Sequence, residues 1–196
     1  MKTVCLDPGH GGSDPGACGP TLRESDQTLD VCLRAREILS PYCNVIMTRT
    51  DDEYVGLTAR AEVSNRNDSD VFISYHFNSA DKDSANGFEI FTTPPENNSD
   101  KLAAKIWSAH RKQLPAQWDR GLKEANFTVI AKAACPAVLI EGEFIHTPAG
   151  EAFIIQNKQA MAHAVADGVL AYLGLDSSPE LTVEQRLDRI EKHLSI

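Results

Sequence analysis

Two histidines follow short apolar segments that have the character of β-strands. His10 lies in the glycine-rich segment DPGHGG, residues 7–12, directly after Thr3–Leu6, and His76 follows Val71–Ser74. Ligands bind in α/β sheets at the carboxyl ends of the strands, and glycines let the backbone approach a bound group closely. Both histidines are therefore candidate metal ligands, although a single loop histidine is more often a plain surface residue.

Glu24 is the candidate for a third ligand, and it has a structural alternative. It lies at the start of a predicted helix, where the spacing Thr21-x-x-Glu24 fits a capping box whose carboxylate accepts a hydrogen bond from a backbone N–H. Taken alone, this residue is better explained by capping. Two histidines and one carboxylate nevertheless form the ligand set of many catalytic zinc sites, which keep a fourth position open for water.

Glu141 ends the apolar segment 136–140, and a carboxylate at such a place needs a partner or a chemical role. A catalytic zinc ion lowers the pKa of water to about 7, and a nearby carboxylate can take the remaining proton and pass it to a leaving amine. We predict this acid–base role for Glu141. Glu143 competes for it, because residues two apart on a strand point the same way.

Apolar runs with β-branched residues alternate with helical patterns along the chain, which predicts a layered α/β domain. The predicted strands are Thr3–Leu6, Asn44–Thr48, Val71–Ser74, Gly87–Thr92, Phe127–Ala131 and Ala137–Ile140. The predicted helices are Ser25–Leu39, Leu57–Asn65, a helix whose face carries Leu102, Ile106, His110 and Leu114, and Gln159–Leu173, which ends at Gly174.

The predicted catalytic domain covers residues 1–174, followed by a polar linker, 175–182, and an amphipathic helix, 183–196. Val183, Leu187, Ile190 and Leu194 have the seam spacing of a coiled coil over barely two heptads. So short a helix is marginal alone in water and must pack on something. It either docks on its own domain or makes the protein a homo-oligomer.

Charge and composition exclude several classes of partner. The chain has 196 residues and a formal net charge of −9, which disfavours binding to nucleic acid. No apolar run is long enough to insert into a membrane, and no signal peptide precedes the first strand, so we expect synthesis in the cytoplasm. The five cysteines form no paired motif and are expected to be reduced.

Taken together and in this order, the segments resemble the zinc-dependent N-acetylmuramoyl-L-alanine amidases, a cell-wall amidase family of bacterial autolysins and phage endolysins. The likeness spans roughly residues 3–173. It rests on DPGHGG at 7–12, Glu24, SYHFN at 74–78, RGLKEANF at 120–127 and PAVLIE at 136–141.

The resemblance implies a mixed, mostly parallel sheet flanked by helices, one zinc ion held by His10, Glu24 and His76, and Glu141 as catalytic acid/base. It implies hydrolysis, by zinc-activated water, of the amide between N-acetylmuramic acid and L-alanine in peptidoglycan. Asn78 would lie beside the metal and orient substrate, and Asn126 belongs to a matching segment. The lack of an export signal and of a wall-binding module suggests a phage or prophage endolysin acting on the bacterial cell wall.

The chain departs from the family pattern just after the catalytic acid. Glu143 stands where the family commonly has glycine before phenylalanine, and His146 replaces a small or polar residue. Both changes border the expected cleft and bear on substrate preference. Two alternatives stay open: a zinc peptidase that cuts stem peptides with the same ligand set, and a non-catalytic wall-binding protein.

Overall fold

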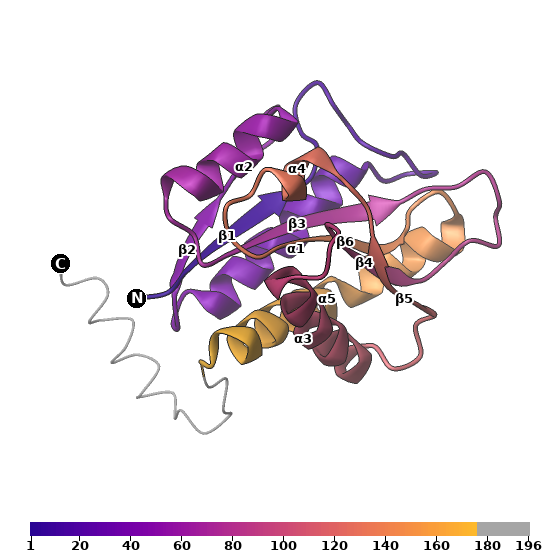
Figure 1. Ribbon diagram of the computed structural model, residues 1–196. Helices are drawn as coiled ribbons and strands as arrows, with labels where there is room; N and C mark the ends of the chain where they lie inside the picture. The colour runs from indigo at the N-terminus through magenta and orange to yellow at the C-terminus, as the bar shows by residue number, and fades with distance from the viewer. Residues whose placement is uncertain (176–196) are drawn as a thin grey trace.

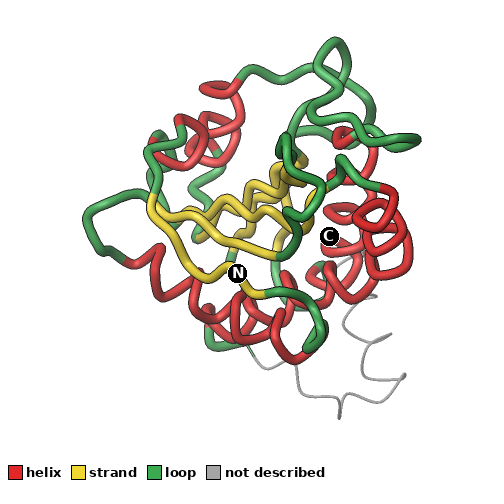
Figure 2. The backbone as a smooth tube through the Cα atoms, turned by 90° about the vertical axis from the view of Figure 1, so that its right-hand side faces the viewer, coloured by secondary structure: helices red, strands yellow, loops and turns green. Residues whose placement is uncertain are grey.

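A computed structural model describes residues 1–175, which fold around one six-stranded sheet with helices on both sides (Figures 1 and 2). The strands are β1 (Thr3–Pro8), β2 (Asn44–Met47), β3 (Val71–Asn78), β4 (Phe88–Thr92), β5 (Asp119–Glu124) and β6 (Ala137–Phe144). The helices are α1 (Glu24–Leu39), α2 (Leu57–Arg66), α3 (Asn98–Gln113), α4 (Thr128–Ala131) and α5 (Pro148–Leu173).

The sheet has the order β2-β1-β3-β6-β4-β5 and is mostly parallel. β1 pairs in parallel with β2 and β3, and β3 pairs in parallel with β6. The sense changes between β6 and β4, which are antiparallel, and β5 then runs parallel to β4. The predicted mixed, mostly parallel α/β sheet is confirmed.

The two faces of the sheet are covered unequally. Val4, Ile73 and Ile140 point to the face on which α1, α3 and α5 build the larger core. Their neighbours in sequence, among them Cys5, Phe72 and Leu139, point to the other face, where Val129 and Ile130 of α4 complete a smaller cluster. Figure 1 shows α2 and α4 on this second face. By the alternation of the strands, His76 and Glu141 belong to this second face.

The predicted strand Phe127–Ala131 is wrong, because this segment forms the short helix α4 after an N-cap at Phe127. A short apolar run does not distinguish a strand from a helical turn. One turn of helix places the consecutive side chains of Val129 and Ile130 against the sheet, with exposed fractions of 3% and 2%. In a strand, these two neighbours would point to opposite faces.

β5 is a strand that hydrophobic patterning does not predict. It lies at the edge of the sheet and carries Asp119, Arg120, Lys123 and Glu124, with no fully buried residue. Charged side chains are common on edge strands, where they discourage pairing with other chains. The periodicity of a half-buried strand is therefore absent from this segment.

Three elements, α5, β3 and β6, extend by four or more residues beyond their predicted bounds. α5 begins at Pro148 instead of Gln159, with Thr147 as its N-cap accepting a hydrogen bond from the Gly150 N–H. It ends, as predicted, at Gly174, whose φ of 67° is left-handed. β3 continues to Asn78 and β6 to Phe144, so His76 and Glu141 lie inside strands near their carboxyl ends.

The sequence also led to expectations about the cysteines, membrane insertion and the C-terminal segment. The five cysteines are free, and Cys18 is the exposed one among them. None of the helices within residues 1–175 is long and apolar enough to cross a membrane. The predicted helix 183–196, and the predicted linker beyond Leu175, lie outside the described residues.

His110, near the end of α3, is a buried neutral group whose protonation opposes folding. It stacks on Phe88 with ring centroids 3.5 Å apart, and its Nε2 lies 2.6 Å from Oε1 of Gln117. The Gln117 amide nitrogen donates to Gly142 and Glu143, so Oε1 accepts and His110 Nε2 is the donor. Burial, only partly offset by this hydrogen bond, lowers the pKa of His110 from 6.5 to about 4.

We predict that His110 makes the protein less stable as the pH falls from about 6.5 to about 4. In this window the unfolded chain binds a proton at His110 and the folded chain does not, which lowers the free energy of unfolding by about 3 kcal/mol across the window. Urea unfolding of wild type and His110→Gln at several pH values measures it: the variant should lose this part of the pH dependence. His163→Gln, at a partly exposed histidine, is the control. If the free energy of unfolding changed equally with pH in wild type and in His110→Gln, the lowered pKa of His110 would be contradicted.

Candidate functional site

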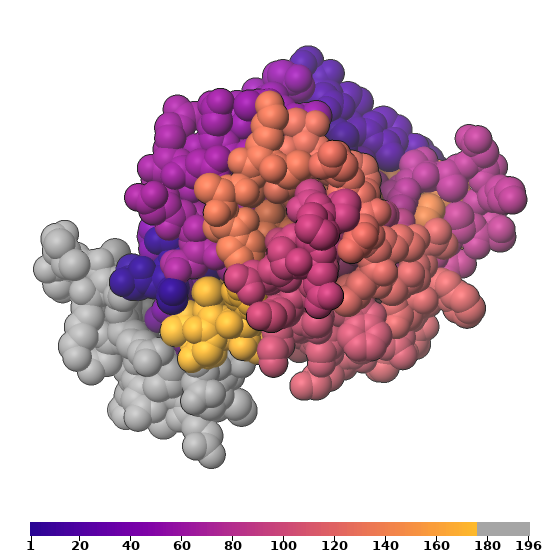
Figure 3. Space-filling view, in the orientation of Figure 1, coloured from indigo at the N-terminus to yellow at the C-terminus, as the bar shows by residue number. Residues whose placement is uncertain are grey.

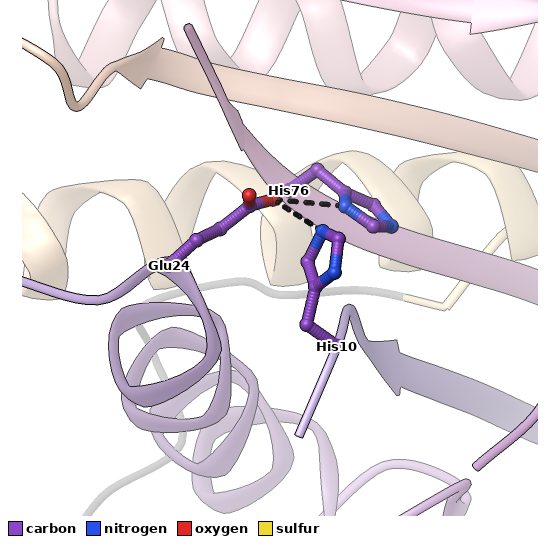
Figure 4. Close-up of side chains that lie close together, drawn as sticks. All are labelled: His10, Glu24 and His76. Atoms are coloured by element: carbon purple, nitrogen blue, oxygen red, sulfur yellow. Dashed lines mark hydrogen bonds and ion pairs between the residues drawn. The ribbon is translucent and has the colours of Figure 1, made fainter. Parts of the chain in front are cut away.

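Three of the predicted site residues meet at the carboxyl ends of β1 and β3. His10, Glu24 and His76 each offer a ligand atom, and these atoms all lie within 4.8 Å of one another. Glu24 Oε1 is 2.9 Å from Nδ1 of His76 and 3.2 Å from Nε2 of His10 (Figure 4). The segments that follow β1 and β3, indigo and magenta, gather at the same end of the molecule in Figure 3.

Glu24 is buried at the first position of α1 and serves the cluster instead of capping its helix. The N-cap is Arg23, and no side chain caps the helix. Oε2 of Glu24 accepts a hydrogen bond from the Ala17 N–H at 2.8 Å, and Oε1 accepts one from the Phe77 N–H at 3.0 Å. Burial opposes ionisation, but the close contacts with the two histidines hold the pKa of Glu24 well below its ordinary value. The capping box predicted as an alternative is absent: Thr21 instead donates to Glu151.

His10 is oriented by Asp14, a residue that sequence reasoning missed. Nδ1 of His10 donates to Oδ2 of Asp14 at 2.8 Å, which leaves Nε2 directed at Glu24. Burial works against protonation of His10, but hydrogen bonds and charges from Glu24 and Asp14 together raise its pKa. A histidine that binds metal commonly gives its other ring N–H to a carboxylate. The signal available in the sequence was the spacing of four residues between His10 and Asp14 in the same glycine-rich turn.

Two glycines leave the space that the cluster occupies. A Cβ atom on Gly9 would come within 2.3 Å of the His76 ring, and one on Gly16 within 2.6 Å of both Glu24 Oε2 and His10 Cδ2. Gly16 also has a left-handed φ of 68°. The close approach that the glycines of the DPGHGG segment suggested is realised at Gly9, and Gly16, four residues beyond that segment, provides a second one.

Two buried arginines hold the backbone that carries His10. Arg60 donates to the carbonyl oxygens of Pro8 and His10 at 2.6 and 2.7 Å, and Arg49 donates to those of Pro8 and Gly9 at 3.0 and 2.9 Å. Asp7, fully buried, pairs with Arg60 at 2.8 Å. These contacts keep His10 at a left-handed φ of 61°, which is rare for residues other than glycine. No pattern in the sequence marked either arginine as buried.

Glu141 lies beside the cluster without a hydrogen-bond partner for one of its oxygens. On β6 it is paired with His76 of β3 on one side and with Glu89 of β4 on the other. Its Oε2 is buried and, within the described part of the chain, accepts no hydrogen bond. Burial, with the charges of Glu24 and Glu89, raises the pKa of Glu141 well above its ordinary value. Such a carboxyl group holds a proton more readily than an ordinary glutamate and is suited to proton transfer.

Both carboxylate oxygens of Glu143, the alternative candidate for the acid–base role, accept hydrogen bonds from other groups. Its Oε1 accepts hydrogen bonds from the backbone N–H groups of Gly87 and Phe144 at 2.6 and 2.8 Å, and its Oε2 accepts one from Gln117 at 2.8 Å. The β3–β6 pairing is irregular at this point, between the pairs His76–Glu141 and Asn78–Phe144. Glu143 is buried among these donors and lies outside the cluster of His10, Glu24 and His76.

Of the other residues singled out in the sequence, Asn78 lies near the cluster, whereas Asn126 and His146 lie in loops. Asn78 donates to Oε1 of Glu89 at 2.6 Å, two residues beyond His76 on β3. Asn126 is exposed in the loop between β5 and α4. His146 lies after β6, where Nε2 contacts the carbonyl oxygen of Lys82 at 3.1 Å. Asn78 is thus close to the candidate site, and Asn126 stays a predicted substrate contact.

The donor set fits a single small cation. Two imidazoles and one ionised carboxylate converge, the set that binds catalytic zinc in many hydrolases. Asp14 keeps the Nε2 lone pair of neutral His10 available on the cluster side. The site can therefore hold a metal beside Glu141, whose buried Oε2 has no other partner among residues 1–175.

Curated relatives carry the same family name as the matching family model. Residues 4–171 match the N-acetylmuramoyl-L-alanine amidase family. The sporulation-specific N-acetylmuramoyl-L-alanine amidase of Bacillus subtilis is 37% identical over 150 residues, covering 75% of this chain and 58% of that protein. The amidase LytC of the same organism is 34% identical over 177 residues, covering 87% of this chain and 35% of that protein. The chain thus spans about a third to three fifths of these two relatives.

Solved structures agree in fold. The catalytic domain of CwlV, an amidase from Bacillus (Paenibacillus) polymyxa, has a TM-score of 0.85 at 30% identity, covering 90% of this chain and all of that one. An N-acetylmuramoyl-L-alanine amidase from Clostridium difficile 630 has a TM-score of 0.85 at 34% identity, covering 88% of this chain and 97% of that one. Family match, identity and fold agree over nearly all of the described residues, and the chain belongs to the N-acetylmuramoyl-L-alanine amidase family.

Proposed function

We propose that this protein is a zinc-dependent N-acetylmuramoyl-L-alanine amidase that hydrolyses the amide bond between N-acetylmuramic acid and L-alanine in peptidoglycan. The observation that carries the proposal is the convergence of His10, Glu24 and His76 beside Glu141 in a chain of this family. The named relatives are amidases of the same bond.

His10, Glu24 and His76 would hold the metal, one ion per catalytic domain. Bound there, zinc would supply Lewis acidity, which polarises an amide carbonyl and lowers the pKa of water. Glu24 brings a negative charge into a buried place, where the backbone N–H groups of Ala17 and Phe77 keep its carboxylate in position. Asp14 would keep His10 in the tautomer that offers Nε2.

Glu141 would move the proton. It accepts a proton from the attacking water as the new C–O bond forms, and it donates that proton to the alanine nitrogen as the C–N bond breaks. The products are a lactyl carboxylate on the glycan and a stem peptide with a free amine. The buried Oε2 of Glu141, which has no partner within residues 1–175, is available for both transfers.

Two alternatives from the sequence are less well supported than the amidase. A zinc peptidase could use the same ligand set, but the fold and the family match both favour the amidases. A non-catalytic wall-binding protein would not need Glu141 with a free buried oxygen beside the cluster. The endolysin setting and self-association through residues 183–196 stay predictions.

Digestion of purified peptidoglycan tests the proposal. With zinc-loaded protein, mass spectrometry should find free stem peptides that begin with alanine, together with glycan strands that have lost their peptides. Cleavage inside the stem peptide would instead support the peptidase. No cleavage of several wall types by the zinc-loaded protein would contradict the proposal and favour the wall-binding protein.

The acid–base role predicts that Glu141→Gln lowers turnover by about a hundred- to ten-thousandfold while zinc still binds with the same stoichiometry. Glu143→Gln is the matched control, since it makes the same change two residues away on a carboxylate that is held by Gly87, Phe144 and Gln117. Release of peptide and bound zinc are measured for both. If Glu143→Gln lost turnover and Glu141→Gln kept it, the two roles would have to be exchanged.

Asp14→Asn should weaken zinc binding by about 10- to 100-fold, because an amide no longer fixes the N–H of His10 Nδ1 as a carboxylate does. Competition with a chromogenic chelator gives the affinity. Asp52→Asn is the control: Asp52 accepts a hydrogen bond from the Gly12 N–H at 2.8 Å and so supports the same loop without contacting the histidine. An equal loss in both variants would show that loop stability, and not the orientation of His10, sets the affinity.

A further inference from the structure

Beside Glu141, the sheet carries a buried carboxylate that holds two cations. Glu89 on β4 is 3% exposed. Its Oε2 accepts hydrogen bonds from Arg120 Nε at 2.7 Å and from Lys123 Nζ, both on β5. Its Oε1 accepts one from Asn78. We call Glu89, Arg120 and Lys123 the cationic group.

The cationic group carries a net positive charge. One cation would neutralise Glu89, and the group contains two, so one positive charge is in excess. The side chains of Arg120 and Lys123 are 31% and 36% exposed, although the protein as a whole has a formal net charge of −9. An exposed surplus cation next to a candidate active site is suited to an anionic part of a substrate.

Neighbouring aromatic rings hold the two cations in place. The guanidinium carbon of Arg120 lies 4.9 Å from the centroid of the Phe144 ring, and Nζ of Lys123 lies 5.7 Å from that of Phe91. The bond from Arg120 to Glu89 uses Nε, so the two terminal nitrogens lie outside this bond. A planar guanidinium presented in this way can bind a carboxylate with two hydrogen bonds.

The distance between the cluster of His10, Glu24 and His76 and the cationic group can be compared with the length of a bound peptide. His76, Glu141 and Glu89 are paired in one row across β3, β6 and β4. At about 4.8 Å between strands, Glu89 lies about 10 Å from His76 along this row, with Glu141 between them. An extended peptide advances about 3.5 Å per residue. The second residue after the scissile amide therefore ends about 7 Å from that bond, and a carboxylate group projecting from it extends a further ~2–3 Å, to about the distance of Glu89.

We infer that the cationic group binds the free carboxylate on the second residue of the stem peptide and thereby selects peptidoglycan in which that carboxylate is not amidated. The inference rests on the proposed amidase function. In that function Glu141 must reach the leaving nitrogen, so the peptide leaves the site past Glu141. The next strands in the sheet on that side are β4 and β5, which carry the cationic group.

The experiment compares two soluble disaccharide–peptides that differ only at the second peptide residue, which carries a free carboxylate in one and a primary amide in the other. Wild type should cleave the carboxylate form with a kcat/KM about 10-fold higher or more, mainly through a lower KM. The preference should shrink as the NaCl concentration rises, because part of the cationic group is exposed.

Arg120→Gln and Lys123→Met should each reduce this preference to less than about threefold, and each leaves one cation to neutralise Glu89. Arg66→Gln is the control, since it removes an arginine from α2, with a side chain 69% exposed, and changes the net charge equally. It should keep the wild-type preference. Thermal unfolding checks that each variant is folded.

The outcomes separate this inference from the proposed function. A preference that is unchanged in both variants, or a wild type that cleaves the two substrates equally at low salt, overturns the inference alone. Cleavage of neither substrate by zinc-loaded wild type overturns the amidase function and the inference with it. If a variant does not fold, the salt dependence of the wild-type preference still decides, because its absence overturns the inference.

Discussion

Buried arginines hold three consecutive backbone carbonyl groups, those of residues 8–10, in the segment that places His10 beside Glu24 and His76. Arg49 and Arg60 are each 2% exposed and donate to these carbonyls, while Asp7 supplies the opposite charge. The left-handed backbone of His10 costs about 1–3 kcal/mol. Loss of one partner from a buried ion pair costs about 3–5 kcal/mol, so the network is strong enough to impose this backbone on a residue that would avoid it.

The unequal covering of the sheet explains where this network and the cluster can lie. Three helices bury one face, and the smaller pair α2 and α4 covers only part of the other. On that second face, polar residues take the positions that continue the apolar alternation: Ser74 and His76 follow Phe72, and Glu141 follows Leu139. Because β3 and β6 are parallel and both extend beyond their apolar segments, these polar residues lie together near the carboxyl ends of the two strands.

Three glutamates within this region have different surroundings, and the differences set what each can do. Glu24 lies 2.9 Å and 3.2 Å from ring nitrogens of two histidines and stays ionised. Glu89 is neutralised by two cations. Glu141 lies between a histidine and Glu89 in the sheet, and its buried Oε2 has no partner in the described chain. Environments that separate the pKa values of neighbouring carboxyl groups are a general means of dividing acid, base and ligand roles.

The sequence by itself determined the α/β class, most strands and helices, and the candidates His10, Glu24, His76 and Glu141, because apolar runs and the residues at their ends are local in the chain. It did not determine α4, the edge strand β5, the roles of Asp14, Arg49 and Arg60, or the separate place of Glu143. The charged strand β5 has no local signal, and the two arginines act on residues about 40 to 50 positions away. Only the tertiary structure decided these, since burial and hydrogen-bond partners depend on which distant segments the sheet brings together.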